Sequence, residues 1–148
     1  MEKNAIKPFN PLLGETFDYE NEEFKFFSEQ VSHHPPVAAS IWIGKKQNFR
    51  FWTNSKMNSK FNGRFLEINQ VYHTYCKLED HNETYEFTAP TISAHNLVVG
   101  TLYLDMGGAG RIRILEKPEY EAKIKYFRRG WLSKDEFKLN GDVTRVNP

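Results

Sequence analysis

Apolar and polar residues alternate along most of this chain with a period of two. The clearest case is 121–126, Glu-Ala-Lys-Ile-Lys-Tyr, and the same alternation occurs at 23–26, 48–51, 101–105 and 111–114. A period of two places one set of side chains on each face of a β-strand. No stretch of ten or more residues shows a helical period with capping residues. We therefore expect about nine or ten antiparallel strands and almost no helix.

Residues that favour turns separate these segments and predict reversals of the chain. They are Asn62-Gly63, Asp80–Asn82, Gly107–Gly110, Lys117-Pro118 and Asn140-Gly141. Residues 136–146 read as a further strand. The predicted fold class is all-β, an antiparallel meander with little helix. The edges of such a sheet must close, curl or pair, so we expect a homo-oligomer formed through exposed sheet edges, or frayed edges.

The composition indicates one folded domain. The chain has 148 residues, of which 39% are hydrophobic and 26% are charged, and these values are typical of a globular protein rather than a disordered one. Aromatic residues make up 15% of the chain and favour strands. The net charge of +1 creates no overall field that would attract nucleic acid or membrane.

Cysteine content and hydropathy bear on the compartment. Cys76 is the only cysteine, so no internal disulfide can form and a reducing compartment is expected. No apolar run approaches the roughly 20 residues of a transmembrane helix. No signal-peptide pattern opens the chain. We therefore expect a cytoplasmic protein.

An unusual segment, Glu-Gln-Val-Ser-His-His-Pro-Pro, occupies residues 29–36. In a regular strand His33 and His34 would point to opposite faces. The two prolines that follow cannot donate to a sheet ladder, so the strand must end or bulge here, at an edge of the sheet. A bulge would turn both imidazoles toward one ligand. Their N–H groups would suit the oxygens of a phosphate.

Two other interpretations of this histidine pair remain open from the residues alone. His33 and His34 would serve as ordinary surface side chains at a strand end, or as metal ligands. Adjacent histidines are poorly spaced for one metal ion, and His73, His81 and His95 are scattered along the chain. We expect no metal site.

A second irregular segment, Lys-Pro-Phe-Asn-Pro-Leu-Leu-Gly-Glu, occupies residues 7–15. Its two prolines fix a turn that presents Lys7 as a point charge and Asn10 as an amide donor. These two side chains and the two histidines would converge on one phosphate group. The alternative is a solvated lysine and a turn-forming asparagine.

These two segments resemble a known family. Residues 29–36 resemble the fingerprint of the oxysterol-binding protein-related family, and residues 7–15 resemble the block that precedes it. Looser resemblances to later blocks occur at Gly100-Thr101, Asp105–Gly108, Tyr126-Phe127 and Phe137. The resemblance implies a partial, incomplete β-barrel with a lipid tunnel. The family domain is longer, so residues 1–148 are expected to be a fragment of it, from the central barrel portion.

The resemblance also implies a site. In this family the Lys and Asn of the first block and both His of the second hold the phosphates of phosphatidylinositol 4-phosphate. The corresponding headgroup-binding residues here are Lys7, Asn10, His33 and His34. Many members exchange a sterol or phosphatidylserine for the phosphoinositide at membrane contact sites. The implied protein binds and transfers lipids, works in the cytoplasm and peripherally at membranes, and needs no cofactor.

An alternative function is a phosphoinositide-recognition module that does not transfer lipid. The lid and the C-terminal segments of the family domain are not recognisable in this chain, and both contribute to a closed tunnel. Catalysis is not expected, because no nucleophile has a base placed to activate it.

A basic segment at 122–134 contains no acidic residue. It would contact an anionic membrane, bind nucleic acid, or form a solvated strand face. The alternation of Ile124 and Tyr126 with Lys123 and Lys125 favours the solvated face. We expect no nucleic-acid partner.

Overall fold

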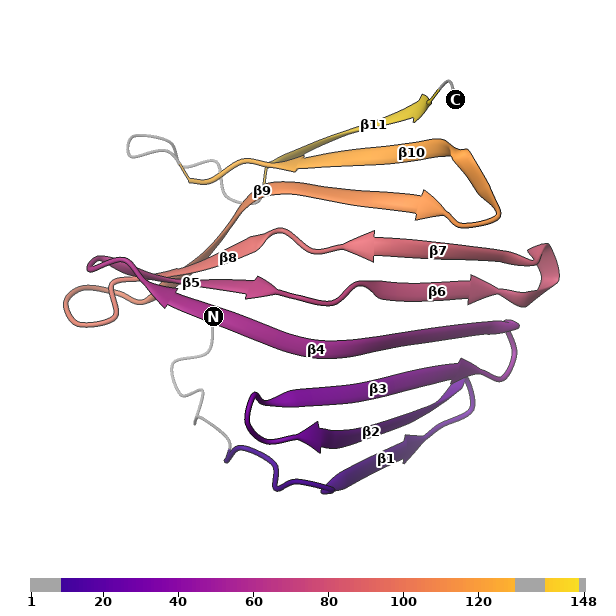
Figure 1. Cartoon of the computed structure of the whole chain (residues 1–148), viewed down its shortest axis with the longest axis horizontal. Coiled ribbons are helices and arrows are strands. Elements are labelled where there is room, and N and C mark those ends of the chain that lie inside the picture. Colours follow the sequence, from indigo (N-terminus) through magenta and orange to yellow (C-terminus); the bar gives the residue numbers. More distant parts are fainter. Residues whose placement is uncertain (1–8, 130–137, 147–148) are drawn as a thin grey trace.

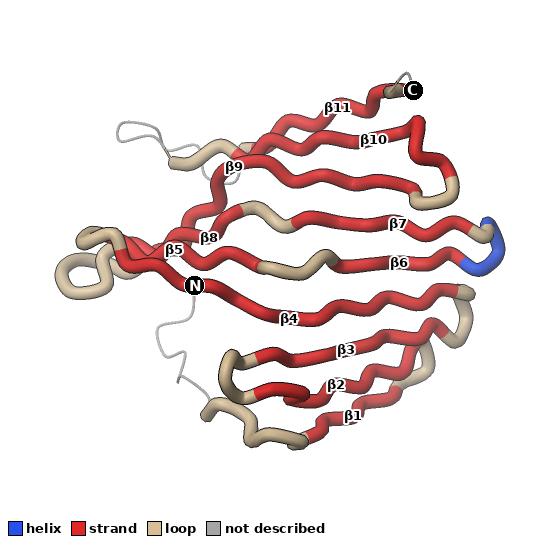
Figure 2. The backbone as a smooth tube through the Cα atoms, in the orientation of Figure 1, coloured by secondary structure: helices blue, strands red, loops and turns tan. Residues whose placement is uncertain are grey.

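The structure is a computed structural model that describes residues 9–129 and 138–146. Within this part of the chain there is no helix long and apolar enough to cross a bilayer, and the single helical turn is the 3-10 turn η1. Figure 1 shows that the strands lie side by side in one sheet, and Figure 2 shows how little of the backbone lies outside it. The elements are β1 (Thr16–Glu20), β2 (Phe24–Ser32), β3 (Val37–Gly44), β4 (Phe49–Phe61), β5 (Phe65–Gln70), β6 (Thr74–Leu78), η1 (Glu79–His81), β7 (Glu83–Thr88), β8 (Thr91–His95), β9 (Tyr103–Ile114), β10 (Lys117–Tyr126) and β11 (Leu139–Arg145).

All the strand pairs are antiparallel, which confirms the fold class expected from the sequence. The order across the sheet is β1-β2-β3-β4-β5-β8-β9-β10-β11, and β6 and β7 form a second ladder between β4 and β9. Strand β4 pairs with β6 through residues 49–53 and with β5 through residues 57–61. The two ladders close a ring of strands between β4 and β9. Residues 71–73 and 89–90 separate the ladders.

One face of the sheet is apolar. Directly paired residues share a face, so the register places Phe26, Trp42 and Phe51 in one row. Their ring centroids lie 4.5 Å and 5.1 Å apart, which is contact distance for aromatic pairs. Further apolar side chains lie on the same face, namely Phe17, Tyr19, Cys76, Phe87, Ile112, Ile124, Tyr126, Leu139 and Val143.

This apolar face is not covered by the described part of the chain. The accessible surface is 11,642 Å², whereas a compact monomer of this mass exposes about 7,800 Å². Among the described residues, Ala94 is the one hydrophobic residue that is buried. The sheet therefore offers a large apolar surface to a ligand, to another chain or to further polypeptide.

The opposite face is polar around Glu86 of β7, which is 7% exposed. In β2, β3 and β4 the same face carries Phe27, Ile41 and Trp52. The Glu86 carboxylate accepts hydrogen bonds from His73 Nδ1 at 2.7 Å, from the Tyr75 hydroxyl at 3.2 Å and from Arg113 Nε at 2.9 Å. Burial by itself raises the pKa of Glu86, but the hydrogen bonds from His73 and Arg113 and the charge of Arg113 outweigh it. They lower the pKa to about 2.

One predicted turn lies inside a strand. Gly107–Gly110 belong to β9, and larger side chains pack across this backbone. A Cβ atom at Gly107 would lie 2.4 Å from the side chain of Arg128, and one at Gly110 would lie 3.2 Å from the ring of Tyr126. The glycines therefore permit a close approach of side chains rather than a reversal of the chain.

Two other predicted turns are also strand residues. Lys117 and Pro118 begin β10, where the pairing with β9 is irregular between Lys117 and Glu121, and such an irregularity tolerates a proline. Asn140 and Gly141 lie in β11, which pairs only with β10 among the described strands. A strand at a sheet edge places fewer demands on its residues than a central strand.

Substitution of Glu86 by Gln is expected to lower the free energy of unfolding by about 2 kcal/mol at neutral pH, because Arg113 and His73 lose a charged partner. The pKa of Glu86 is about 2 in the folded chain and about 4.3 in an unfolded one. The stabilisation is therefore complete above about pH 4.3 and is lost as the pH falls toward 2. Urea unfolding of the parent chain and the variant, between neutral pH and about pH 3, measures the difference in their free energies of unfolding. If this difference does not shrink on acidification, the account of Glu86 is contradicted.

Edge pairing between copies is expected in solution. All the residues of β1 and β11 are exposed, and each strand pairs on one side only within the described sheet. Unpaired N–H and C=O groups at such edges favour association. Sedimentation velocity over a range of concentrations should show dimers or larger species. A compact monomer at every concentration would exclude this association.

Candidate functional site

Two segments that are distant in the sequence meet at one edge of the sheet, where β1 begins and β2 ends (Figure 1). The N–H of Gly14 donates to the carbonyl of Gln30 at 2.9 Å, and the N–H of Gln30 donates to the carbonyl of Glu15 at 3.0 Å. These bonds continue the β1–β2 ladder beyond the first residue of β1. They place Gly14 and Glu15 beside Gln30, close to the end of β2.

The first segment ends in a tight turn. The N–H of Glu15 donates to the carbonyl of Leu12 at 3.0 Å, and the Glu15 carboxylate accepts the N–H of Leu12 at 2.7 Å. Gly14 has a φ of +76°, a left-handed conformation that favours glycine. Asn10 lies just before this turn and is exposed.

The second segment is shaped by a bulge, as the prolines predicted. The pairing of β2 with β3 shifts between Gln30 and Ser32. The buried Gln30 donates from Nε2 to the Ser32 carbonyl at 2.7 Å, and the Ser32 hydroxyl donates to the Pro35 carbonyl at 2.7 Å. The side chains of Gln30 and Ser32 therefore stabilise the turn through hydrogen bonds to its backbone carbonyls.

This turn brings the two imidazoles together. The ring centroids of His33 and His34 lie 4.5 Å apart with an interplanar angle of 67°, and both residues are exposed. Neighbouring imidazoles at a strand end offer N–H donors to an anion from solvent. Among the described residues, no group of three or more His, Cys, Asp or Glu is arranged to hold a metal ion.

The four predicted headgroup residues differ in how far the structure describes them. His33 and His34 are in contact, and Asn10 lies in the segment that is bonded to the same edge. No hydrogen bond joins Asn10 to either histidine in the described part of the chain. Lys7 lies outside the described residues.

A hollow of about 270 Å³ lies on the apolar face, and the residues that line it were not predicted. It is lined mainly by apolar side chains, including Phe51, Phe87, Ile112, Ile124 and Tyr126. The alternating pattern identified these residues as one face of each strand. It did not indicate which strands would lie side by side, and the hollow depends on that pairing.

The described part of the basic segment forms a polar strand face followed by a chain that folds back over β9. Lys123 and Lys125 alternate with apolar residues of β10 as expected, and Lys123 Nζ lies 3.3 Å from a Glu121 carboxylate oxygen. Arg128 contacts Glu67 of β5 at 3.2 Å. Residues 130–134 of this segment lie outside the described part.

The chain matches known proteins over nearly its whole length. The model of the family described as "Oxysterol-binding protein" matches residues 1–147. Oxysterol-binding protein-related protein 2 of Mus musculus is 43% identical over 95% of this chain, which corresponds to 29% of the mouse protein. Oxysterol-binding protein-related protein 1C of Arabidopsis thaliana is 37% identical over 96% of this chain and 17% of its own length.

Solved structures have the same fold. The Osh1 ORD domain in complex with ergosterol has a TM-score of 0.82 and 32% identity, and the match covers 97% of this chain and 34% of that one. The Osh3 ORD of Saccharomyces cerevisiae in complex with PI(4)P has a TM-score of 0.78 and 30% identity over 88% of this chain and 34% of that one. The chain thus spans about a third of these ORD chains. It belongs to the oxysterol-binding protein family.

Proposed function

We propose that this chain binds the headgroup of phosphatidylinositol 4-phosphate through Lys7, Asn10, His33 and His34. The observation that carries the proposal is the pair of exposed imidazoles at the end of β2, beside the segment that contains Asn10. Imidazole N–H groups, an amide and an ammonium group are suitable donors for phosphate oxygens. The similarity to the Osh3 ORD, which was solved with PI(4)P, supports this assignment.

The apolar face would accommodate the hydrophobic part of a lipid. The hollow between Phe87, Ile112 and Ile124 lies on the face whose surface the described chain leaves open. A sterol is a candidate second ligand, since the related Osh1 ORD was solved with cholesterol and with ergosterol. Headgroup donors at the sheet edge and an apolar face beside them suit an amphiphilic ligand. The protein would then carry lipids in the cytoplasm and at membranes, without catalysing a reaction.

A second candidate function is recognition of the headgroup without lipid transfer. The large uncovered surface favours it, because a carrier must shield the acyl chains of its lipid from water. In this case the chain would bind vesicles that contain the phosphoinositide but would not move lipid between donor and acceptor vesicles. A transfer assay separates the two functions.

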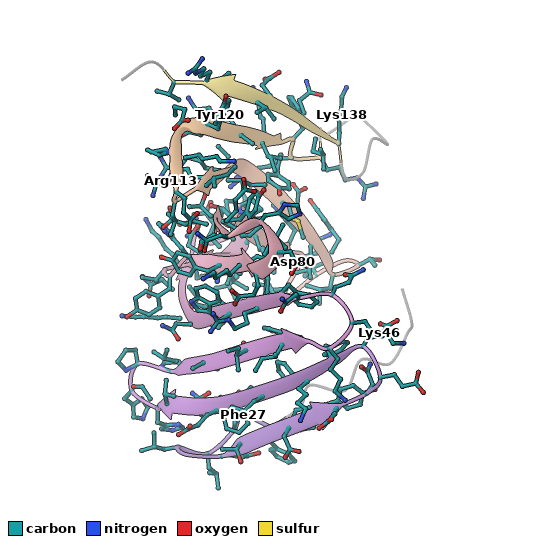
Figure 3. The ribbon with its side chains drawn as sticks, turned by 90° about the vertical axis from the view of Figure 1, so that its right-hand side faces the viewer. Phe27, Lys46, Asp80, Arg113, Tyr120 and Lys138 are labelled. Atoms are coloured by element: carbon teal, nitrogen blue, oxygen red, sulfur yellow. The ribbon has the colours of Figure 1, made fainter. Side chains whose placement is uncertain are left out.

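Replacement of His33 and His34 by Ala is expected to weaken binding to vesicles that contain phosphatidylinositol 4-phosphate by at least about tenfold, because charge-assisted hydrogen bonds to the phosphate are lost. Vesicle co-sedimentation with and without this lipid measures the effect. His81→Ala is the matched control. His81 is also exposed, but it belongs to the turn beside Asp80, at the opposite edge of the sheet, which faces the viewer in Figure 3. Equal binding by the double variant and the parent chain would remove these histidines from the site.

The apolar face has its own test. Ile124→Glu is expected to reduce binding of a fluorescent sterol by at least about tenfold, because a carboxylate in the hollow must lose water when the sterol enters. Lys125→Glu is the control, since Lys125 follows Ile124 on β10 and lies on the polar face. Fluorescence titration and circular dichroism should be recorded for both variants. If folded Ile124→Glu binds the sterol as the parent chain does, the hollow is not the sterol site.

A further inference from the structure

The loop between β8 and β9 presents an apolar tip to solvent. Val98 is 89% exposed and Val99 is 81% exposed, and Leu97 beside them is 44% exposed. We refer to residues 97–99 as the apolar tip. Two adjacent valines with so little cover are costly in water unless the tip meets an apolar partner.

The neck of this loop is fixed, so the tip is held away from the sheet. Asn96 donates from Nδ2 to the carbonyl of Thr101 at 3.0 Å. Asn96 and Gly100 both have left-handed backbone conformations, with φ values of 60° and 96°. Below the neck, His95 and Tyr103 are paired and their rings stack with centroids 4.7 Å apart. These contacts hold the two ends of the loop together, and Val98 and Val99 lie exposed between them.

A basic turn lies beside the apolar tip. The β4–β5 turn is the neighbour because Phe65, which follows the turn, pairs with His95, which precedes the loop. Arg64 lies in the turn and Lys60 lies at the end of β4, opposite Glu67 in the register. No ion pair is found for either side chain among the described residues. Phe61, the last residue of β4, is 58% exposed. Figure 1 shows the turn and the loop projecting together beyond the left edge of the sheet.

The candidate headgroup site faces the same way. Because the strands are antiparallel, β2, β4 and β8 end on the same side of the sheet on which β3, β5 and β9 begin. The β2–β3 turn with His33 and His34 therefore lies on the same side of the sheet as the apolar tip.

We propose that the apolar tip inserts into the interfacial region of an anionic bilayer while Lys60 and Arg64 contact the lipid headgroups. Apolar side chains flanked by cations are the combination that such an interface binds. A protein partner is a poorer fit, since a stable protein interface buries at least about 1,000 Å² and this tip is a small protrusion. The proposal concerns the whole bilayer and does not require a phosphoinositide, so it goes beyond the function proposed above.

The main test uses vesicles of phosphatidylcholine and phosphatidylserine that contain no phosphoinositide. The variant with Val98→Ser and Val99→Ser is expected to bind at least about tenfold more weakly than the parent chain, because the apolar insertion is lost. Leu115→Ser is the control, since Leu115 is 48% exposed and lies in the turn between β9 and β10, at the end of β9 opposite to the loop. Circular dichroism checks that each variant is folded. Equal binding by the tip variant and the parent chain would overturn the proposal.

Charge and depth can be tested separately. Lys60→Gln with Arg64→Gln should weaken binding to these anionic vesicles, and rising salt should weaken binding of the parent chain. A polarity-sensitive dye attached after Val98→Cys, in a chain with Cys76→Ser, should shift its emission to the blue when vesicles are added. A blue shift that occurs with protein concentration alone would show that the tip meets another copy, and would overturn the membrane assignment.

The two proposals fail in different ways. The chain with His33→Ala and His34→Ala should bind the phosphoinositide-free vesicles like the parent chain. If the histidine variant loses only its preference for phosphoinositide, both proposals stand. If the tip variant keeps full binding to the simple vesicles, the insertion proposal fails and the headgroup proposal is unaffected.

Discussion

Cross-strand register is the constraint on which this molecule depends. The described strands form one sheet without a covering layer, so the residue opposite each side chain decides its surroundings. A shift of one residue would move the row of Phe26, Trp42 and Phe51 to the polar face. On that polar face, Glu86 holds the same register through its bonds to Tyr75 and Arg113. An apolar row and an ionic cluster on opposite faces therefore specify one alignment of the strands.

The same register gathers the proposed functional features at one end of the strands. Antiparallel pairing brings alternate strand ends together, and the bonds between Gly14, Gln30 and Glu15 attach the N-terminal segment there. The pair of His33 and His34, the proposed membrane tip and one end of the apolar face all lie toward this end. An amphiphilic ligand would find polar donors and apolar surface side by side, which is the arrangement that a lipid at a bilayer requires.

Local chemistry predicted part of this arrangement correctly. Alternation located the strands, and two prolines predicted the irregular end of β2. The turns expected at Gly107–Gly110 and Asn140-Gly141 are wrong, because these residues lie in β9 and β11 and a glycine need not mark a reversal of the chain. In β9, Gly107 instead makes room for Arg128, a residue about twenty positions away. No local pattern reports a contact of that kind.

The sequence by itself determined that the chain forms antiparallel strands, which side of most strands is apolar, and the family to which the motif residues belong. These properties depend on near neighbours along the chain, such as the alternation of Ile124 with Lys125 or the prolines that follow His34. Only the tertiary structure decided which strands pair, where the hollow lies and that Val98 is exposed to solvent. Those properties depend on the register between distant segments, which is set by the sum of many weak contacts across the sheet.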